Sequence, residues 1–273
     1  MNQPHKSRHV VAVIILAITA GVYGYLAIYD TRLDDSQIRL ATVALKTHDP
    51  SLYTHDPVFG DDGLWRGHSP MFLGAMKILL EPIGYDDLTI PFRIMSPMLT
   101  LVFLLGMYTL VFRQCYNWSV SVFIAILSTT VTPAPAGVSW GVGPLAMVTP
   151  MGVCLAFLPL LVIAFLRSWE RYKRSGHETK SGLWRLLVIF GCIGALGNVD
   201  LGMSINMSII MACVYLAGRR FRPLAWLIVV VCLLIATAAA TPQILRYTML
   251  AQGSAPKAPI VFDAFAQGGM RAM

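Results

Sequence analysis

Long apolar runs alternate with short polar segments along most of the chain. The first run, residues 10–29, supplies about 20 apolar residues, the length of helix that crosses the hydrocarbon core of a bilayer. Further runs predict membrane-spanning helices at residues 91–112, 118–131, 150–166, 183–196, 204–217 and 224–240. The pattern predicts an all-α integral membrane protein with about seven transmembrane helices.

One apolar run does not fit this series. Residues 70–80 are interrupted by Lys77 and followed by Glu81 and Pro82, so the run is too short to span comfortably. We expect it to form a juxtamembrane helix that lies on the membrane surface.

Composition and charge agree with a membrane protein and orient it. The chain is 56% hydrophobic and 13% charged, and its net charge is +7. Lys and Arg gather at Arg113, at residues 167–180 and at residues 219–222, where they act as topological signals and do not point to nucleic acid. Seven spans with a cytoplasmic N-terminus place all three clusters on the cytoplasmic side. The prediction is a multi-pass protein of the bacterial inner (plasma) membrane that begins with an uncleaved signal anchor.

The same topology places four segments together on the outer face: residues 30–90, 132–149, 198–202 and the tail. Residues 1–240 then form the transmembrane module, with residues 30–90 as an acidic outer-face loop. Residues 241–273 form an outer-face C-terminal tail, which we expect to be truncated because no closing element follows it. Most of the 14 Asp and Glu residues lie between Asp30 and Asp87, so this loop carries most of the candidate acid/base and metal chemistry.

Two adjacent carboxylates open the acidic loop. Asp34 and Asp35 precede residues 38–46, where apolar positions recur on one helical face. Asp34 can cap that helix, Gln37 can close a capping box, and Asp35 can interact with the helix dipole. Alternatively, a carboxylate at a membrane-surface helix start can act as a general base or bind a divalent cation beside a phosphate-bearing lipid.

A short repeat follows in the same loop. Thr-His-Asp-Pro occurs at residues 47–50 and again at 54–57, so His55 and Asp56 form one of two His-Asp pairs on a Pro-stiffened segment. The pair is a candidate metal site, although two solvated Asp-Pro turns also explain the repeat.

Three further residues are candidates for substrate contacts. His68 stands at the entrance of the juxtamembrane helix at residues 70–80 and either contacts a substrate phosphate or forms a helix-entry turn. Arg93, at the outer mouth of the second span, can pair with phosphate or with the acidic loop, or extend to the headgroups. Asp200, between two apolar runs, is either a turn residue or a second wall of the site.

The order of these parts resembles the polyprenyl-phosphate-dependent glycosyltransferases of the GT-C class, relatives of protein O-mannosyltransferases and lipid A aminoarabinose transferases. In that class an acidic residue or pair starts a juxtamembrane helix after the first span, as Asp34-Asp35 does here. HSPMFLGAMKILLEPIG, residues 68–84, is similar to the second juxtamembrane helix, and PFRIMSPMLTLVFLLGMYTLVFR, residues 91–113, to the span after it. The class often has an acidic residue after the Pro of Thr149-Pro150, where this chain has Met151.

The resemblance implies a function and a site. Asp34 or Asp35 would be the catalytic carboxylate, activating the acceptor or helping to hold a divalent metal ion. The phosphate of a polyprenyl-phosphate-linked sugar donor would lie near Arg93 or His68, and the sugar would pass to an envelope acceptor, whether glycan, lipid or protein. The rival hypothesis is a non-catalytic membrane protein, a transporter or an envelope-assembly partner. Transporters place charged residues within their spans, and these spans are nearly free of them.

Overall fold

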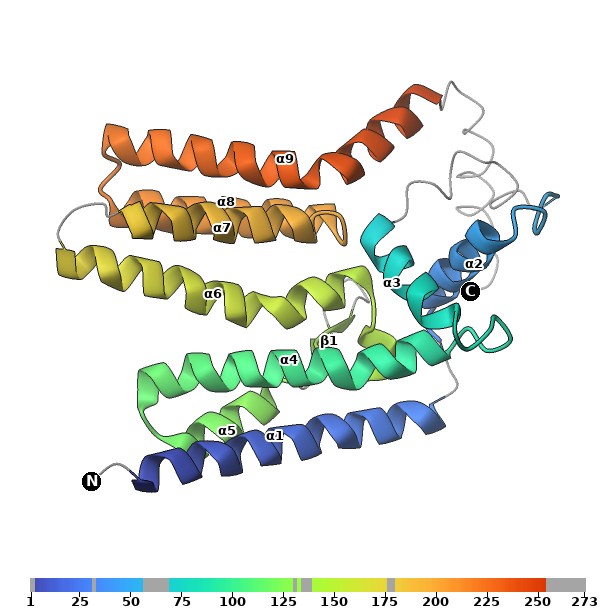
Figure 1. The fold of residues 1–273 in the computed structure, drawn as a ribbon, viewed down its shortest axis with the longest axis horizontal. Helices are drawn as coiled ribbons and strands as arrows, with labels where there is room; N and C mark the ends of the chain where they lie inside the picture. Colours follow the sequence, from blue (N-terminus) through green and yellow to red (C-terminus); the bar gives the residue numbers. More distant parts are fainter. Residues whose placement is uncertain are drawn as a thin grey trace, which may run out of the picture.

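The computed structural model describes residues 3–30, 33–55, 69–129, 132–133, 139–175 and 180–253 of the 273-residue chain. Long helices lie side by side along the length of the bundle (Figure 1). They are α1 (Gln3–Tyr29), α4 (Ile90–Cys115), α6 (Pro150–Ser175), α7 (Lys180–Leu196), α8 (Leu201–Gly218) and α9 (Pro223–Gly253).

Shorter elements complete the fold. α2 (Asp35–His48) and α3 (Pro70–Leu80) lie together beyond one end of the bundle, and α5 (Trp118–Leu127) lies beside α1 and α4 (Figure 1). β1 (Thr132–Pro133) and β2 (Ser139–Trp140) form a two-residue antiparallel pair, and a single 3-10 turn, Leu145–Met147, precedes α6.

Five of the described helices are long and apolar enough to cross a membrane: α1, α4, α6, α8 and α9. The apolar part of α7, Gly182–Leu196, is shorter, as are α3 and α5. The chain is therefore an all-α multi-pass membrane protein, as the hydropathy pattern predicts. The bounds of α3 match the predicted juxtamembrane helix.

Several helix ends differ from prediction, among them those of α5 and α9. α5 ends at Leu127, short of the expected Val131, where the hydroxyls of Ser128 and Thr129 bond the carbonyls of Ala125 and Ile126 at 2.6 and 2.7 Å. Such local bonds compete with helix continuation. α9, in contrast, continues through Pro242 to Gly253, so the boundary predicted at Ala240 falls inside a helix and the predicted tail starts as helix.

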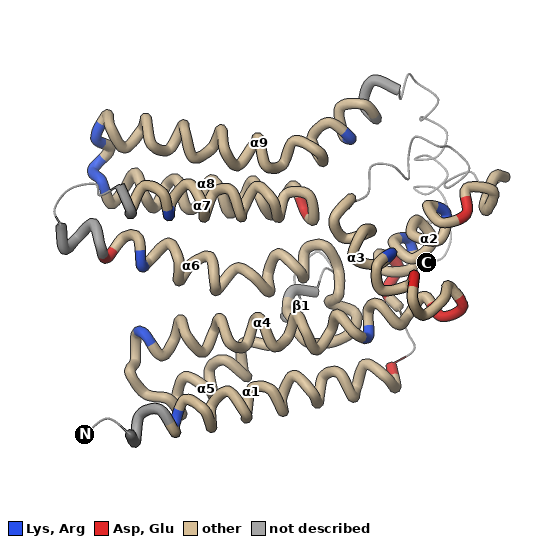
Figure 2. The backbone as a smooth tube through the Cα atoms, in the orientation of Figure 1, with Lys and Arg blue, Asp and Glu red and all other residues tan. Residues whose placement is uncertain are grey.

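The charged residues gather at the two ends of the bundle (Figure 2). We call the end that carries Arg8, Arg113, Arg167 and Arg219–Arg222 the basic end. The opposite end, which we call the acidic end, carries α2, α3 and the acidic residues Asp30, Asp34, Asp35, Asp49, Glu81, Asp86 and Asp87. The grouping expected from the charge pattern is thus present in the fold.

Buried apolar side chains form two clusters. The smaller cluster joins α1, α4 and α5 through residues such as Leu16, Leu104 and Ala125. The larger one lies among α6 to α9 and continues into α2, α3 and the 3-10 turn, where Phe72 and Leu145 are buried. The acidic end is therefore built on the larger cluster.

Small residues let the helices approach one another closely. A Cβ on Gly194 of α7 would collide with the backbone of Ala236 in α9, and one on Gly106 of α4 would lie 2.9 Å from the Cβ of Pro159 in α6. Close backbone approach of this kind is the usual basis of helix packing in lipid, where the hydrophobic effect between helices is absent.

Candidate functional site at the acidic end

Asp34 and Asp35 stand at the start of α2, as the sequence predicts. Asp34 is the N-cap residue, in extended conformation, and its backbone N–H donates to Gln37 Oε1 at 3.0 Å within a capping box. The Ser36 hydroxyl donates to Asp34 Oδ2 at 2.7 Å. Both carboxylates are exposed to solvent. They are thus accessible to a ligand while Asp34 also serves as a helix cap.

Gln37 fixes the start of α2 to the loop before α6. Its side chain is 0% exposed, and its Nε2 donates to the carbonyl oxygens of Leu145 and Val148 at 2.6 and 3.1 Å. All three contacts of this carboxamide, including the one to Asp34, are hydrogen bonds to backbone. Gln37 therefore holds the carboxylate pair in a defined position relative to the bundle.

Spanning helices also hold the Gly-rich segment that precedes the 3-10 turn at Leu145–Met147. Ser96 Oγ of α4 donates to the carbonyl of Gly143 at 2.8 Å. Gly143 has φ +142°, and a Cβ there would lie 2.8 Å from the ring of Tyr23 in α1. Residues 141–149 of the predicted loop are therefore held against α1, α2 and α4, and the side chains of Val142, Leu145 and Val148 are buried.

Arg93 pairs with the acidic loop, one of the alternatives expected from the sequence. Its Nη1 lies 3.4 Å from Asp87 Oδ2, while Asp87 Oδ1 accepts the backbone N–H and the hydroxyl of Thr89 at 2.9 and 2.5 Å. The Thr89 hydrogen bonds, with a smaller contribution from Arg93, hold the pKa of Asp87 below its usual value. Arg93 Nε is buried without a hydrogen-bond partner in the described part of the chain, so the guanidinium retains a free donor.

Asn198 links three elements at the acidic end. Its carbonyl accepts the Ser69 hydroxyl and the backbone N–H of Met71 at 2.9 and 3.2 Å, which holds the start of α3 on the turn between α7 and α8. Its Nδ2 donates to the Ala239 carbonyl at 2.8 Å, and its Oδ1 accepts the Gln243 N–H at 3.2 Å. Asn198 thus reaches α9 on either side of Pro242.

Asp200 serves as the turn residue expected in one of the two interpretations. It is the N-cap of α8, and its Oδ1 accepts the backbone N–H of Met203 at 2.9 Å. Its side chain is half-buried, two positions from Asn198. The turn that carries it belongs to the acidic end together with α3, but within the described residues no hydrogen bond or ion pair joins Asp200 to Asp34 or Arg93.

Of the His-Asp pair predicted as a metal site, Asp56 falls outside the described residues and His55 is exposed in a turn. His68, the candidate phosphate contact, also falls outside the described residues. The first His-Asp pair is used locally: the His48 ring stacks on Tyr85 at 3.8 Å, and Asp49 accepts hydrogen bonds from Ser51 that lower its pKa. Within the described ranges, no group of three or more His, Cys, Asp or Glu side chains is placed to hold a metal ion.

Sequence reasoning did not give Asn198 or Ser96 a role. Both are polar residues beside or inside apolar runs, and a buried polar group requires a partner. That requirement could have marked both as structural anchors, although their partners, the carbonyls of Ala239 and Gly143, carry no sequence signal.

Comparison of the chain with protein-family models, with curated proteins and with solved structures finds no match. The chemistry available at the acidic end therefore has to be judged from its own residues. They offer two exposed carboxylates on a fixed helix start and a partly buried arginine at the mouth of α4, a combination suited to a substrate with a hydroxyl and a phosphate.

Proposed function

We propose that this protein is a GT-C-type glycosyltransferase that moves a sugar from a polyprenyl-phosphate donor to a cell-envelope acceptor on the outer face of the inner membrane. The observation that carries the proposal is the exposed carboxylate pair Asp34-Asp35, held by the buried Gln37 at a helix start beyond the ends of the spans. At this level a polyprenyl tail stays in the bilayer while its phosphate and sugar project to α2.

The proposed topology has about seven crossings, with the N-terminus in the cytoplasm. In this topology α7 and the span predicted at residues 118–131, which begins as α5, complete the seven crossings together with the five long helices. The basic end then faces the cytoplasm and the acidic end faces outward, which is the side on which lipid-linked sugars meet envelope acceptors.

In the proposed reaction, an acceptor hydroxyl oxygen attacks the anomeric carbon of the sugar. The bond between that carbon and the phosphate oxygen breaks, and polyprenyl phosphate leaves with the electron pair. Asp34 or Asp35 takes the proton of the acceptor hydroxyl as general base. A single displacement inverts the anomeric configuration, and holding donor and acceptor together supplies much of the rate.

Arg93 is the proposed contact for the leaving phosphate. Its side chain is 22% exposed, and its ion pair with Asp87 uses only one of its guanidinium nitrogens. Charge-assisted bonds from arginine suit the developing negative charge on phosphate. His68 and Asp200 remain further candidates for the donor pocket. A divalent cation held by Asp34 and Asp35, or by His55 and Asp56, is the metal-dependent form of the same proposal.

The test is transfer of radiolabelled sugar from polyprenyl-phosphate donors by membranes that contain the full chain. Asp34→Asn and Asp35→Asn are informative because Asn is as good an N-cap as Asp, so the start of α2 is retained. Asp49→Asn, at the other end of α2, is the matched control. Loss of at least about 100-fold of transfer in one of the two variants, with the control unchanged, supports a general base.

A different result would favour the non-catalytic hypothesis. Transfer that persists in the Asp34→Asn/Asp35→Asn double variant removes these carboxylates from the reaction. Absence of transfer with every donor, in protein that is correctly inserted, supports an envelope-assembly partner or a transporter.

A further inference from the structure

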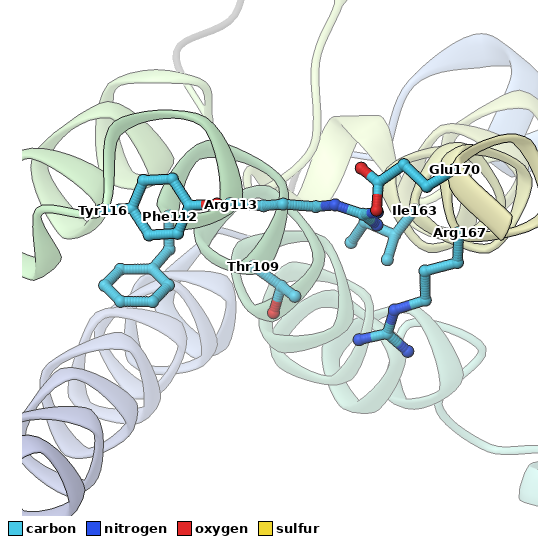
Figure 3. Close-up of a pocket in the computed structure, with 7 residues that line it drawn as sticks. All are labelled: Thr109, Phe112, Arg113, Tyr116, Ile163, Arg167 and Glu170. Atoms are coloured by element: carbon cyan, nitrogen blue, oxygen red, sulfur yellow. The ribbon is translucent and has the colours of Figure 1, made fainter. Parts of the chain in front are cut away.

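A cavity of about 460 Å³ opens between α4 and α6 at the basic end, opposite the proposed transfer site (Figure 3). Polar and charged side chains line one part of it, and apolar side chains line the rest. The residues that line it are Thr109, Phe112, Arg113, Tyr116, Ile163, Arg167 and Glu170.

The position of the cavity follows from the packing of the two helices. α4 and α6 touch closely where Gly106 meets Pro159 and Leu160. Pro159 lies inside α6, and proline is a common cause of helix bending. Beyond this contact, toward the basic end, the larger side chains of Phe112 and Ile163 face the space between the helices.

The arginine on α4 has an unused donor at this cavity. Arg113 forms an ion pair with Glu170 of α6 through Nη2. Its Nη1 is buried and has no hydrogen-bond partner within the described residues. A buried donor without an acceptor costs about 1–3 kcal/mol, so an acceptor at this point would be favourable.

The arginine on α6 makes the cavity positive. Arg167 is exposed and has no carboxylate within ion-pair distance in the described part of the chain, and its side chain extends from α6 into the space that faces Thr109 (Figure 3). Since Glu170 balances only one of the two arginines, the described lining carries a net positive charge.

Aromatic residues of the kind found at membrane interfaces surround the mouth of this cavity. Tyr116, the left-handed C-cap of α4 with φ 51°, is 80% exposed and also lines the cavity. A neighbouring cavity of about 550 Å³ shares Arg167 and adds Trp184 and Arg185. Tyr and Trp beside arginine at helix ends are typical of the membrane interface.

We propose that the cavity binds the phosphodiester headgroup of an anionic phospholipid. Arg167 and the Nη1 edge of Arg113 donate to phosphate oxygens, and an acyl chain passes over Phe112 and Ile163. A soluble phosphate ion would use the same donors but would leave the apolar lining uncovered. Basic pockets between transmembrane helices are suited to anionic lipids for this reason. The proposal does not depend on glycosyl transfer at the acidic end.

The experiment measures lipids retained by the full chain in native mass spectrometry after exchange into detergent with phosphatidylglycerol, phosphatidylcholine or glycerol phosphate. We expect phosphatidylglycerol to be retained in preference to the other two. Arg167→Gln should weaken that retention roughly tenfold, the effect of losing one charge-assisted hydrogen bond. Arg167→Lys should retain most of the preference because it keeps the charge.

Arg222→Gln is the matched control, since it removes the same charge from the exposed turn before α9, at the same end of the bundle. Equal losses in Arg167→Gln and Arg222→Gln would show a diffuse attraction and overturn the site. Equal retention of phosphatidylcholine, or displacement of lipid by glycerol phosphate, would also overturn it. Thr109→Leu, which narrows the cavity and removes a polar group without changing charge, should lower phosphatidylglycerol retention as well.

Discussion

Asn198 Oδ1 accepts the backbone N–H of Gln243, a donor that would bond the carbonyl of Ala239 in a regular α-helix. The Ala239 carbonyl instead accepts Asn198 Nδ2. One side-chain amide is thus inserted into the hydrogen-bond ladder of α9 next to Pro242. Insertion of a side chain is one of the recognised causes of a helix kink, together with proline itself.

Replacing Asn198 with Ala should destabilise the protein by about 1–3 kcal/mol, because it removes the side-chain partner of one buried and one partly buried backbone group in α9. Thermal unfolding of the purified protein measures the loss. Pro242→Ala should restore a continuous ladder, so the double variant should lose clearly less than the sum of the two single variants. Additive losses would show that Asn198 and Pro242 act independently.

Gln37→Leu should cost about 2–3 kcal/mol, since the carbonyls of Leu145 and Val148 lose their donor while the side-chain volume is kept. Ser36→Ala, at an exposed neighbouring position, should change stability by less than about 0.5 kcal/mol. Hydrogen exchange at residues 145–149 is the second measurement. Unchanged exchange there would remove Gln37 as the anchor of the site.

Gly194→Ala should lower the unfolding temperature strongly, because its Cβ would collide with the backbone of Ala236 and force α7 and α9 apart. Gly191→Ala is the matched control on the same helix: its Cβ would meet Ile235 at an ordinary 3.7 Å. We expect the control to unfold at or above the wild-type temperature, since Ala is the better helix former. Similar losses in both variants would contradict the close contact at Gly194.

The Asp87 carboxylate should contribute stability only at higher pH. Its pKa is lower in the folded protein than the usual 3.8, so its contribution is complete above 3.8 and is lost as pH falls through the folded value. Asp87→Asn should therefore flatten the acid limb of the stability profile as pH falls below 3.8, with little change in its shape at neutral pH. Asp86→Asn is the control, and an unaltered acid limb in Asp87→Asn would reject the linkage.

Local patterns in the sequence predicted much of the acidic end. The bounds of α3 follow from an apolar run that stops at Glu81, and the capping box follows from the spacing of Asp34 and Gln37. The division of charge between the two ends follows from the basic clusters. These features depend on residues close together in the chain, so periodicity and spacing are sufficient to find them.

The parts that sequence reasoning missed depend on distant partners. Pro242 normally ends a helix, but α9 continues past it, and the side-chain amide of Asn198, 45 positions from Gln243, bonds the backbone of Gln243 and Ala239. Arg93 had several possible partners within the loop or the headgroups, and only the fold pairs it with Asp87. The short α5 is a different case. It reflects local hydrogen bonds of the Ser128 and Thr129 hydroxyls, which leave no periodic signal in the sequence.

The division of the core into two clusters has a consequence for biogenesis. All buried members of the cluster around α1, α4 and α5 lie between Ala12 and Ala125, so this unit can assemble in the membrane while the rest of the chain is still being synthesised. The acidic end cannot, because Leu145 must reach Gln37 and Gln243 must reach Asn198 before its loops are held. The catalytic geometry proposed for Asp34 and Asp35 is therefore among the last features of the protein to form during translation.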